Sequence, residues 1–291
     1  MSTPNHAPFE RFLSVNDYAP TSVRSFRQDF RKFCAWFEAA NRERFDDTRV
    51  TPRDIADFRR HLREDRRHAV NTVNRCLVTL RRYFGFLAET GVIESNPCSG
   101  IKELRRVVGA PKALERSKVR KLLREATVRH DHRGLAILSI LLYCGLRVGE
   151  LADLELADLD LSERSGSLRV RDGKGSKERF VPIPAEARKA VERYLSMRPP
   201  VDSTRLFIGK GDQPLGTDGV RYLVKKYGIS AGLDLHPHQL RHTMATEYLA
   251  ASENDLVGLA QLLGHESIQT TSRYTRRSLD RLASTANSMH F

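Results

Sequence analysis

Residues 134–151 read GLAILSILLYCGLRVGEL, and this stretch decides the fold of the longer half of the chain. Within it, the apolar run from Leu135 to Leu146 is too short to cross a bilayer and suits a buried helix from about Gly134 to Tyr143. Gly145 is expected to end that helix, because glycine accepts the left-handed conformation of a helix C-cap. The stretch therefore predicts a central core helix with Arg147 directly after its end.

Arg147 is charged at a position where a casual surface charge is not expected. One interpretation is an ion pair with Glu150, three residues later. The other is a guanidinium that binds an anion, for which its planar donor fork is suited. The two interpretations are compatible, because a carboxylate can orient a guanidinium that also binds a ligand.

Outward from the core helix, the sequence predicts more helices and one hairpin. Apolar residues at helical spacing indicate helices at about residues 117–129, 185–197, 217–231, 238–251, 253–263 and 267–273. Alternating residues indicate strands at 167–170 and 179–183, and the glycine-bearing segment 172–177 between them predicts a hairpin turn.

The N-terminal part of the chain has the pattern of a helical bundle. Helices are predicted at about residues 7–16, 21–40, 51–62 and 70–89, the second carrying phenylalanines on one face. Asn96-Pro97 breaks the helical pattern. The fold class is therefore mainly α, in two domains. The predicted boundaries are a disordered N-terminus (1–8), a helical domain (9–101), a basic linker (102–112) and a mixed α domain with a small hairpin (113–291).

Positive charge is spread along the whole chain. The formal net charge is +13, and residues 1–110 carry 20 Lys and Arg against 14 Asp and Glu, while residues 111–291 carry 29 against 22. Two basic halves favour nucleic acid as a partner, with a merely solubilising surface as the alternative. The four cysteines form no CxxC pair and are expected to be buried thiols in a reducing cytoplasm. No signal-peptide core is visible at the N-terminus, and no membrane partner is expected.

Three further motifs carry groups able to do chemistry. His238 and Arg241, three apart at a helix start, project from one face, whereas His242 is expected on a different azimuth. Lys174 lies between two glycines at the hairpin tip, free to hold a phosphate or donate a proton. Taken alone, the first motif is more typical of a solvated helix turn, and the second of an ordinary exposed turn lysine.

The third motif is Gly264-His265, followed nine residues later by Tyr274. A helix that starts here would favour an anion at its N-terminus, although an incidental histidine in a capping turn is the alternative. Tyr274 lies in a polar segment among arginines, which would lower the cost of forming a phenolate. Two arginines, two histidines and a late tyrosine are what a metal-free phosphoryl-transfer site needs.

Taken together, GLRVGEL, GKGSKER, HPHQLRH, LLGHES and Tyr274 resemble the tyrosine site-specific recombinases of the Xer and phage-integrase family, in order and spacing over nearly the whole chain. The resemblance implies a SAM-like helical core-binding domain followed by a catalytic domain. The chain resembles the simple members of the family, because little sequence precedes the first predicted helix. An additional arm-binding domain is therefore not expected.

The resemblance also implies site residues. It assigns the phosphate to Arg147 and Arg241, the nucleophile to Tyr274, general acid catalysis to Lys174, assistance in proton transfer to His238 and His265, and support of the first arginine to Glu150. No cofactor, metal or ATP is expected, because covalent attachment conserves the energy of the phosphodiester bond.

The expected partner is double-stranded DNA with inverted-repeat core sites. Candidate DNA contacts are Arg24 in the second helix, Asn71, Asn74 and Arg75 in the helix 70–89, and Lys177 and Arg179 on the hairpin, with ordinary surface solvation as the alternative. The resemblance implies a homotetramer on two synapsed sites, formed through the C-terminal tail, an accessory partner being an open possibility. The expected location is the cytoplasm, at the nucleoid.

The sequence also has to be compared with what three other functions would require. A type IB topoisomerase-like enzyme would use the same residues to relax supercoils as a monomer. A catalytically idle DNA-binding accessory protein would bind DNA without forming an adduct, which the complete set of six catalytic residues argues against. A metal-dependent nuclease is disfavoured, because the sequence offers no carboxylate cluster.

Overall fold

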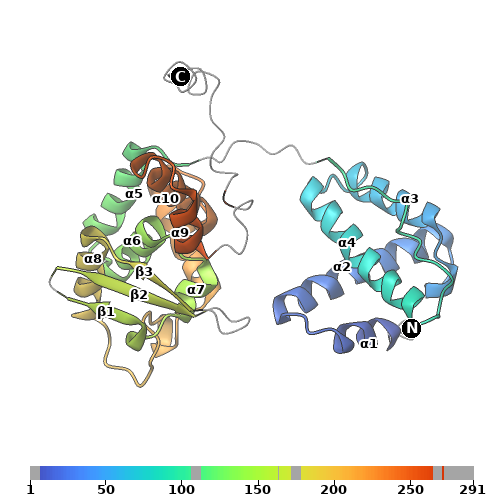
Figure 1. The fold of residues 1–291 in the computed structure, drawn as a ribbon, viewed down its shortest axis with the longest axis horizontal. Helices are drawn as coiled ribbons and strands as arrows, with labels where there is room; N and C mark the ends of the chain where they lie inside the picture. Colours follow the sequence, from blue (N-terminus) through green and yellow to red (C-terminus); the bar gives the residue numbers. More distant parts are fainter. Residues whose placement is uncertain (1–6, 106–112, 163, 172–177, 265–270, 272–291) are drawn as a thin grey trace, which may run out of the picture. The chain divides into compact units, whose positions relative to one another are not determined.

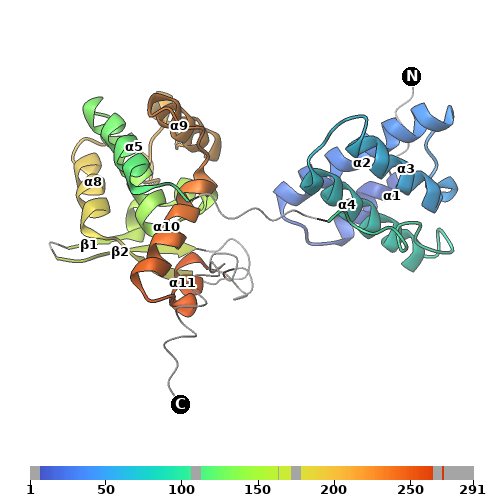
Figure 2. The same ribbon diagram turned by 90° about the horizontal axis from the view of Figure 1, so that it is seen from above.

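The computed structural model describes residues 7–105, 113–162, 164–171, 178–264 and Thr271. The chain divides into two compact units, Met1–Val108 and Gly109–Phe291. Figures 1 and 2 show the helical content of the first unit and the small sheet of the second.

The N-terminal unit is built from helices around an aromatic core. The helices are α1 (Ala7–Val15), α2 (Pro20–Asn41), α3 (Pro52–Arg63) and α4 (Val70–Glu89), with a short 3-10 turn at Asp47–Arg49. Phe9 stacks on Phe30 with ring centroids 3.9 Å apart, and both rings meet the edge of Tyr83. Burial of such rings is the main favourable term for a bundle of this size.

Helix starts in this unit follow local chemistry. Thr51 caps α3 through a capping box with Asp54, and Pro52 occupies the first turn, where its missing N–H has no cost. The helices predicted for this part of the sequence all form, with ends shifted by no more than a few residues.

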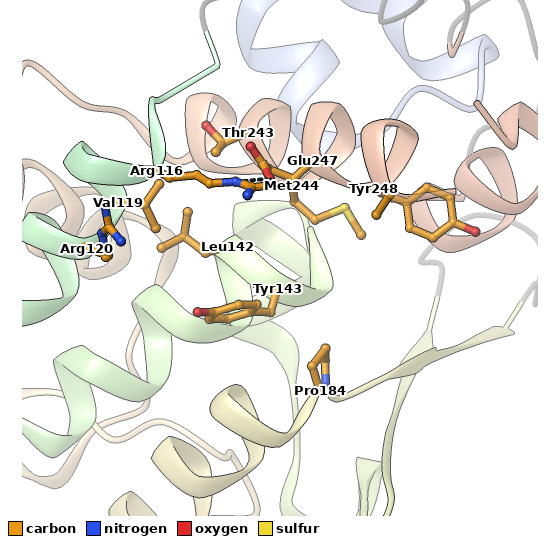
Figure 3. A pocket seen from close by; sticks show the side chains of 11 residues that line it. Arg116, Val119, Arg120, Leu142, Tyr143, Pro184, Thr243, Met244, Glu247 and Tyr248 are labelled. Carbon is orange, nitrogen blue, oxygen red and sulfur yellow. Dashed lines mark hydrogen bonds and ion pairs between the residues drawn. The ribbon is translucent and has the colours of Figure 1, made fainter. Parts of the chain in front are cut away.

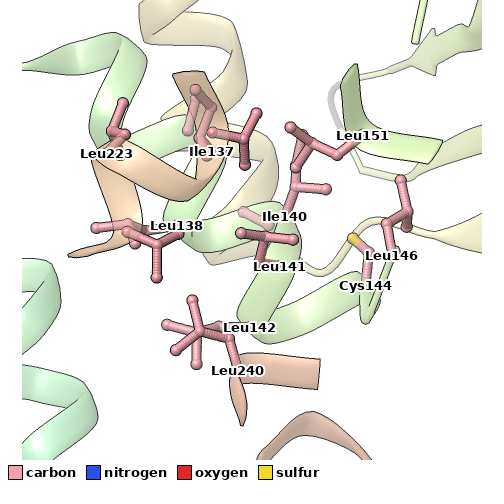
Figure 4. Packing of buried hydrophobic residues seen from close by; sticks show 14 of the residues in the cluster. Ile137, Leu138, Ile140, Leu141, Leu142, Cys144, Leu146, Leu151, Leu223 and Leu240 are labelled. Atoms are coloured by element: carbon pink, nitrogen blue, oxygen red, sulfur yellow. The ribbon is translucent and has the colours of Figure 1, made fainter. Parts of the chain in front are cut away.

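The C-terminal unit surrounds one buried helix. This is α6 (His132–Ser139), continued by a π-helical turn (η2, Ile140–Cys144) that ends at Gly145 in the left-handed conformation, φ 65°. Figure 4 shows leucines and isoleucines of this segment packed against Leu151, Leu223 and Leu240. The other helices are α5 (Arg116–Val128), α7 (Val148–Asp153), α8 (Ala185–Leu195), α9 (Thr217–Ser230), α10 (Pro237–Ala251) and α11 (Leu256–Leu263). The predicted core helix is thus confirmed, but its last turn is π-helical.

A small antiparallel sheet lies at one side of this unit. Among the described residues its strands are β1 (Leu159–Leu161), β2 (Gly166–Arg171) and β3 (Glu178–Pro182), in the order β1-β2-β3. Leu168 pairs with both Leu159 and Val181, and its side chain joins the core. The two predicted strands are confirmed, whereas β1 was missed because three residues are too few for alternation to be visible. The predicted turn 172–177 lies outside the described residues.

The expected helix at 253–263 starts later than predicted. Glu253 and Asn254 adopt positive φ, and the Asp255 side chain accepts a hydrogen bond from the Gly258 N–H, which fixes the start of α11 at Leu256. The predicted helix at 267–273 falls outside the described residues except for Thr271. In the part of the chain that is described, no helix combines the length and apolar character that crossing a membrane requires.

Candidate active site

Glu150 is the centre of a cluster of arginines that come from separate elements. It lies in the first turn of α7, and its carboxylate accepts hydrogen bonds from the Arg147 N–H (2.7 Å) and the Arg147 Nη1 (2.7 Å). Arg179 of β3 donates to both carboxylate oxygens at 3.0 and 2.8 Å. Nη1 of Arg241, from α10, lies 3.8 Å from Oε2. The ion pair between Arg147 and Glu150 that the sequence predicted is therefore present.

The Glu150 carboxyl stays ionised because of these partners. Its side chain is only 12% exposed, and burial by itself would raise its pKa. Hydrogen bonds and charge from Arg179, together with the backbone and side chain of Arg147, outweigh burial and lower the pKa to about 2. A carboxylate fixed in this way can orient guanidinium groups throughout the neutral pH range.

The same three arginines also converge on the C-terminal end of α11. Arg179 Nε donates to the Leu262 carbonyl at 2.9 Å, Arg241 Nη2 to the Leu263 carbonyl at 2.7 Å, and Arg147 Nη2 to the Gly264 carbonyl at 3.1 Å. The last carbonyls of a helix have no partner within the helix, and its dipole favours cations there. The end of α11 thus supplies a fixed acceptor for each arginine.

Two glycines allow this close approach. Gly264 ends α11 with φ 62°, and a Cβ atom there would lie 2.8 Å from the Arg179 Nη1. Gly145 has φ 65°, its carbonyl accepts from Arg241 Nη1 at 2.7 Å, and a Cβ atom would lie 3.0 Å from the Met244 sulfur. Any larger residue would be strained at both positions and would move the arginines.

The arginines differ in how much of each is accessible. The side chain of Arg147 is 46% exposed, that of Arg179 15%, and that of Arg241 3%. One carboxylate faces three guanidinium groups, so the cluster carries an excess of positive charge. Such an arrangement favours an anion with several oxygens, as in a phosphate.

Histidines lie at the start of α10, on the helix that carries Arg241. His236 caps the helix by accepting from the Gln239 N–H, and His238 is exposed in its first turn. The rings of His238 and His242 are 4.3 Å apart in an edge-to-face arrangement. The prediction that His242 lies on a different azimuth was wrong, because residues four apart on a helix are neighbours.

Four of the predicted site residues lie outside the described residues: Lys174, Lys177, His265 and Tyr274. The structure therefore brings together Arg147, Glu150 and Arg241, with His238 on the same helix as Arg241. Among the described residues, no group of three or more His, Cys, Asp and Glu side chains is suited to hold a metal ion.

The predicted DNA contacts divide into exposed and buried residues. Arg24 lines a hollow on α2 with Arg27, Arg31 and Lys32. On α4, Asn71 is exposed, and Arg75, with 41% of its side chain exposed, donates to the buried Asp29 at 2.8 Å. These positions remain candidates for contact with a polyanion.

Two of the predicted contacts are corrected by the structure. Asn74 is 1% exposed, and its amide binds the N–H and carbonyl of Leu104, so it joins α4 to the chain that follows the helix and cannot read a base edge. Arg179 points into the protein, where its guanidinium binds Glu150 and the Leu262 carbonyl. In both cases an internal partner replaces the expected contact with DNA.

Comparisons with known proteins agree with this architecture. The model of the phage integrase family matches residues 112–281, and that of the phage integrase N-terminal SAM-like domain matches residues 7–91. Tyrosine recombinase XerC of Pseudomonas savastanoi pv. phaseolicola is 32% identical over 284 residues, which cover 95% of this chain and 92% of the relative. The chain belongs to the phage integrase family of tyrosine recombinases. XerC of Alcanivorax borkumensis is 37% identical over 228 residues, 75% of this chain and 73% of the relative.

Solved structures of tyrosine recombinases share the fold. The XerH site-specific recombinase bound to its palindromic difH substrate matches with a TM-score of 0.76 and 20% identity, over 91% of this chain and 79% of that chain. The Tn1549 transposon integrase in complex with circular intermediate DNA matches with a TM-score of 0.74 and 19% identity, over 99% of this chain and all of that chain (100%). The predicted pair of domains, a SAM-like helical domain and a catalytic domain, is therefore confirmed.

Proposed function

We propose that this protein is a site-specific DNA recombinase that cuts and rejoins strands through a covalent 3′-phosphotyrosyl intermediate. The observation that carries the proposal is the cluster of Arg147 and Arg241 around Glu150, fixed on the end of α11 in a chain that belongs to the tyrosine recombinases. Integration, excision and resolution of DNA circles are all products of this chemistry.

The proposed cleavage step needs no metal ion or nucleotide. The Tyr274 oxygen forms a bond to phosphorus while the bond from phosphorus to the 5′-oxygen breaks, and Lys174 gives a proton to that oxygen. Arg147 and Arg241 stabilise the charge that develops on the non-bridging oxygens. His238 and His265 assist proton transfer near neutral pH, and one of these imidazoles accepts the proton that the Tyr274 phenol loses. Attack by the free 5′-hydroxyl of a second strand reverses the step and leads through a Holliday junction.

The proposed partner is double-stranded DNA with inverted core sites, bound by four copies of the chain across two sites. The exposed Arg24 on α2 and the half-exposed Arg75 on α4 supply positive charge that suits contact with the DNA backbone. Base contacts from Asn71 and phosphate contacts from Lys177 belong to the same proposal.

The described C-terminal unit also offers a candidate acceptor for the tail of a neighbouring copy. A hollow of about 550 Å³ lies between α5, the π-helical turn and α10. Figure 3 shows its apolar lining by Leu142, Tyr143 and Met244, with the Arg116–Glu247 ion pair along one side. The tail sequence contains Leu279 and Leu282, which suit such a hollow. Removing residues 278–291 should abolish cooperative binding to DNA in a gel-shift titration; unchanged cooperativity would contradict this assembly.

Covalent capture tests the proposed function directly. Wild type and Tyr274→Phe are mixed with sheared genomic DNA from the source, and adducts are trapped in denaturant with EDTA present and sequenced. We expect adducts in the wild type alone, converging on an inverted-repeat sequence. Binding without any adduct would support a catalytically idle DNA-binding protein instead. Relaxation of supercoils without recombinant products would support a topoisomerase-like enzyme.

A further inference from the structure

Arg179 differs from its neighbours on the sheet. On β2, Arg169 and Arg171 keep 36% and 43% of their side chains exposed and pair with Asp158, whereas Arg179 is only 15% exposed. Each nitrogen of its guanidinium donates a hydrogen bond to the protein. An arginine with this burial and these partners is suited to hold other groups in place rather than to reach a ligand.

Arg179 connects the two features on which the other arginines depend. Its Nη1 and Nη2 atoms donate hydrogen bonds to the two carboxylate oxygens of Glu150, and its Nε donates to the Leu262 carbonyl. Glu150 in turn binds Arg147, and the next two carbonyls along the chain bind Arg241 and Arg147. Through these hydrogen bonds, Arg179 on β3 connects the start of α7 to the C-terminal end of α11.

We propose that Arg179 is a positioning residue for DNA cleavage: it holds Glu150 and the C-terminal end of α11 in the arrangement that presents Arg147 and Arg241 to the scissile phosphate. This inference rests on the proposed function. Arg179 binds both oxygens of Glu150, so the single negative charge of this carboxylate is shared between Arg179 and Arg147. Glu150 therefore orients the half-exposed Arg147 without cancelling all of its positive charge. A bidentate fork also fixes direction, which a single charge cannot do.

The test compares Arg179→Met and Arg179→Lys with the matched control Arg171→Met. Arg171 lies on the same sheet and also pairs with carboxylates, at 2.7 Å from Asp158 and 3.1 Å from Glu155, but it contacts neither Glu150 nor the end of α11 in any described bond. The probe is a duplex carrying the site recovered by covalent capture. The rate of adduct formation is measured over a range of DNA concentrations.

Positioning predicts a loss of rate rather than of binding. We expect Arg179→Met to lower the rate at saturating DNA by roughly 10- to 100-fold, with less than about a threefold change in the DNA concentration for half-maximal rate. Arg179→Lys should recover part of the rate, since it restores the charge but not the fork. Arg171→Met should match the wild type.

The pH profile separates this role from a loss of folding. Without Arg179, the pKa of Glu150 loses the largest influence that lowers it. The rate of Arg179→Met should therefore fall further between pH 8 and pH 5 than that of the wild type or Arg171→Met. If Arg179→Met fails to fold, a double-mutant cycle of Arg179→Lys and Glu150→Gln tests the role instead. Arg179→Lys should lower the rate of adduct formation by a smaller factor in the Glu150→Gln background than in the wild type.

The outcomes distinguish the inference from the proposed function. A wild type that cleaves, together with an Arg179→Met variant of normal rate and normal pH profile, overturns the inference alone. Equal costs of Arg179→Lys in both backgrounds overturn it as well. A wild type that forms no adduct overturns the proposed function and the inference with it.

Discussion

Two carboxylates with little exposure, Asp29 in the N-terminal unit and Glu150 in the C-terminal unit, each accept hydrogen bonds from several donors, with different results. Asp29 is fully buried and accepts from Arg75, the Cys76 thiol and the Thr79 hydroxyl, with Lys32 at 3.9 Å. Glu150 keeps slight exposure, and its side-chain partners are arginines.

The difference lies in the balance of charge. Two of the donors to Asp29, the Cys76 thiol and the Thr79 hydroxyl, are neutral. The cluster therefore mainly joins α2 to α4 and fixes the position of the Arg75 side chain at the surface. Around Glu150, three guanidinium groups share one carboxylate and the end of a helix, so positive charge remains for a ligand. We infer that the first cluster presents a binding surface, while the second is a reaction site.

The largest effect is expected at Arg241. Arg241→Met removes a donor proposed to contact the phosphate, and we expect the rate of adduct formation to fall by roughly 10³-fold. DNA binding in a gel-shift assay should change little. Arg221→Met is the control, because Arg221 is 54% exposed on α9 and pairs with Asp218. A rate within tenfold of the wild type would show that Arg241 does not take part in cleavage. The Glu150 cluster would then be structural, as the Asp29 cluster is inferred to be.

A smaller effect is expected at Glu150. Glu150→Gln keeps the shape of the side chain but leaves the three arginines without a counter-charge, so the rate should fall by roughly 10- to 100-fold. Stability should also fall, by about 3 kcal/mol near neutral pH, in denaturant unfolding followed by circular dichroism. Loss of stability with an unchanged rate would make Glu150 a structural residue, as Asp29 is inferred to be.

The pH dependence of that stability difference has a defined sign. The folded-state pKa of Glu150 is lowered from an ordinary value of 4.5 to about 2. Its contribution is therefore fully present above about pH 5 and is lost as the pH falls from 4.5 towards 2. The curves for the wild type and Glu150→Gln should converge over this window, and parallel curves down to pH 2 would contradict the assignment.

Asp29→Asn should affect binding but not chemistry. We expect about 2 kcal/mol of lost stability in the N-terminal unit, because a buried carboxylate that accepts several donors is replaced. The Kd for DNA should rise a few-fold, with an unchanged rate at saturating DNA. The single tryptophan of the chain, Trp36, lies on α2 and reports unfolding of this unit by fluorescence. Asp57→Asn on α3 is the control, since Asp57 pairs only with arginines of its own helix among the described contacts.

The smallest effect is expected at Asp47, whose described side-chain partner is the neutral Tyr83 phenol at 2.8 Å. Burial raises the pKa of Asp47 to about 6, although the hydrogen bond from Tyr83 opposes the change. Its contribution to stability is present below the ordinary pKa of 3.8 and is lost as the pH rises through 6. Relative to Asp47→Asn, the wild type should lose about 1 kcal/mol between pH 5 and pH 7, measured by Trp36 fluorescence. A constant difference would show that Asp47 does not titrate in this range.

Local patterns predicted the helices, the hairpin strands and the motif residues, but not the direction in which some side chains point. The signals were nevertheless present. Asn74 lies three residues before Leu77, on the buried stripe of α4, and Arg179 lies two residues before the buried Val181, on the inner face of β3. The prediction of DNA contacts rested on the types of these two residues, whereas the periodicity of α4 and β3 places both side chains on the buried face.

Other features depend on contacts between distant parts of the chain and could not be predicted from local patterns. Arg241 reaches the carbonyl of Gly145, 96 residues earlier, and Arg147 reaches that of Gly264, 117 residues later. Those contacts need the packing of α10 against the π-helical turn, and of α11 against α10 and β3. The sequence could therefore identify the members of the cluster but not the helix end on which they converge.

The π-helical turn at Ile140–Cys144 makes the direction of Arg147 sensitive to the length of the core helix. A π turn accommodates one residue more than an α-helical turn, and each residue of a helix corresponds to about 100° of rotation. Deleting one residue here would restore α-helical phase and swing the direction of the chain at Gly145, and with it Arg147, away from α11. A single-residue deletion in this turn, which carries no charged side chain, would thus misdirect the arginines as effectively as a substitution among them.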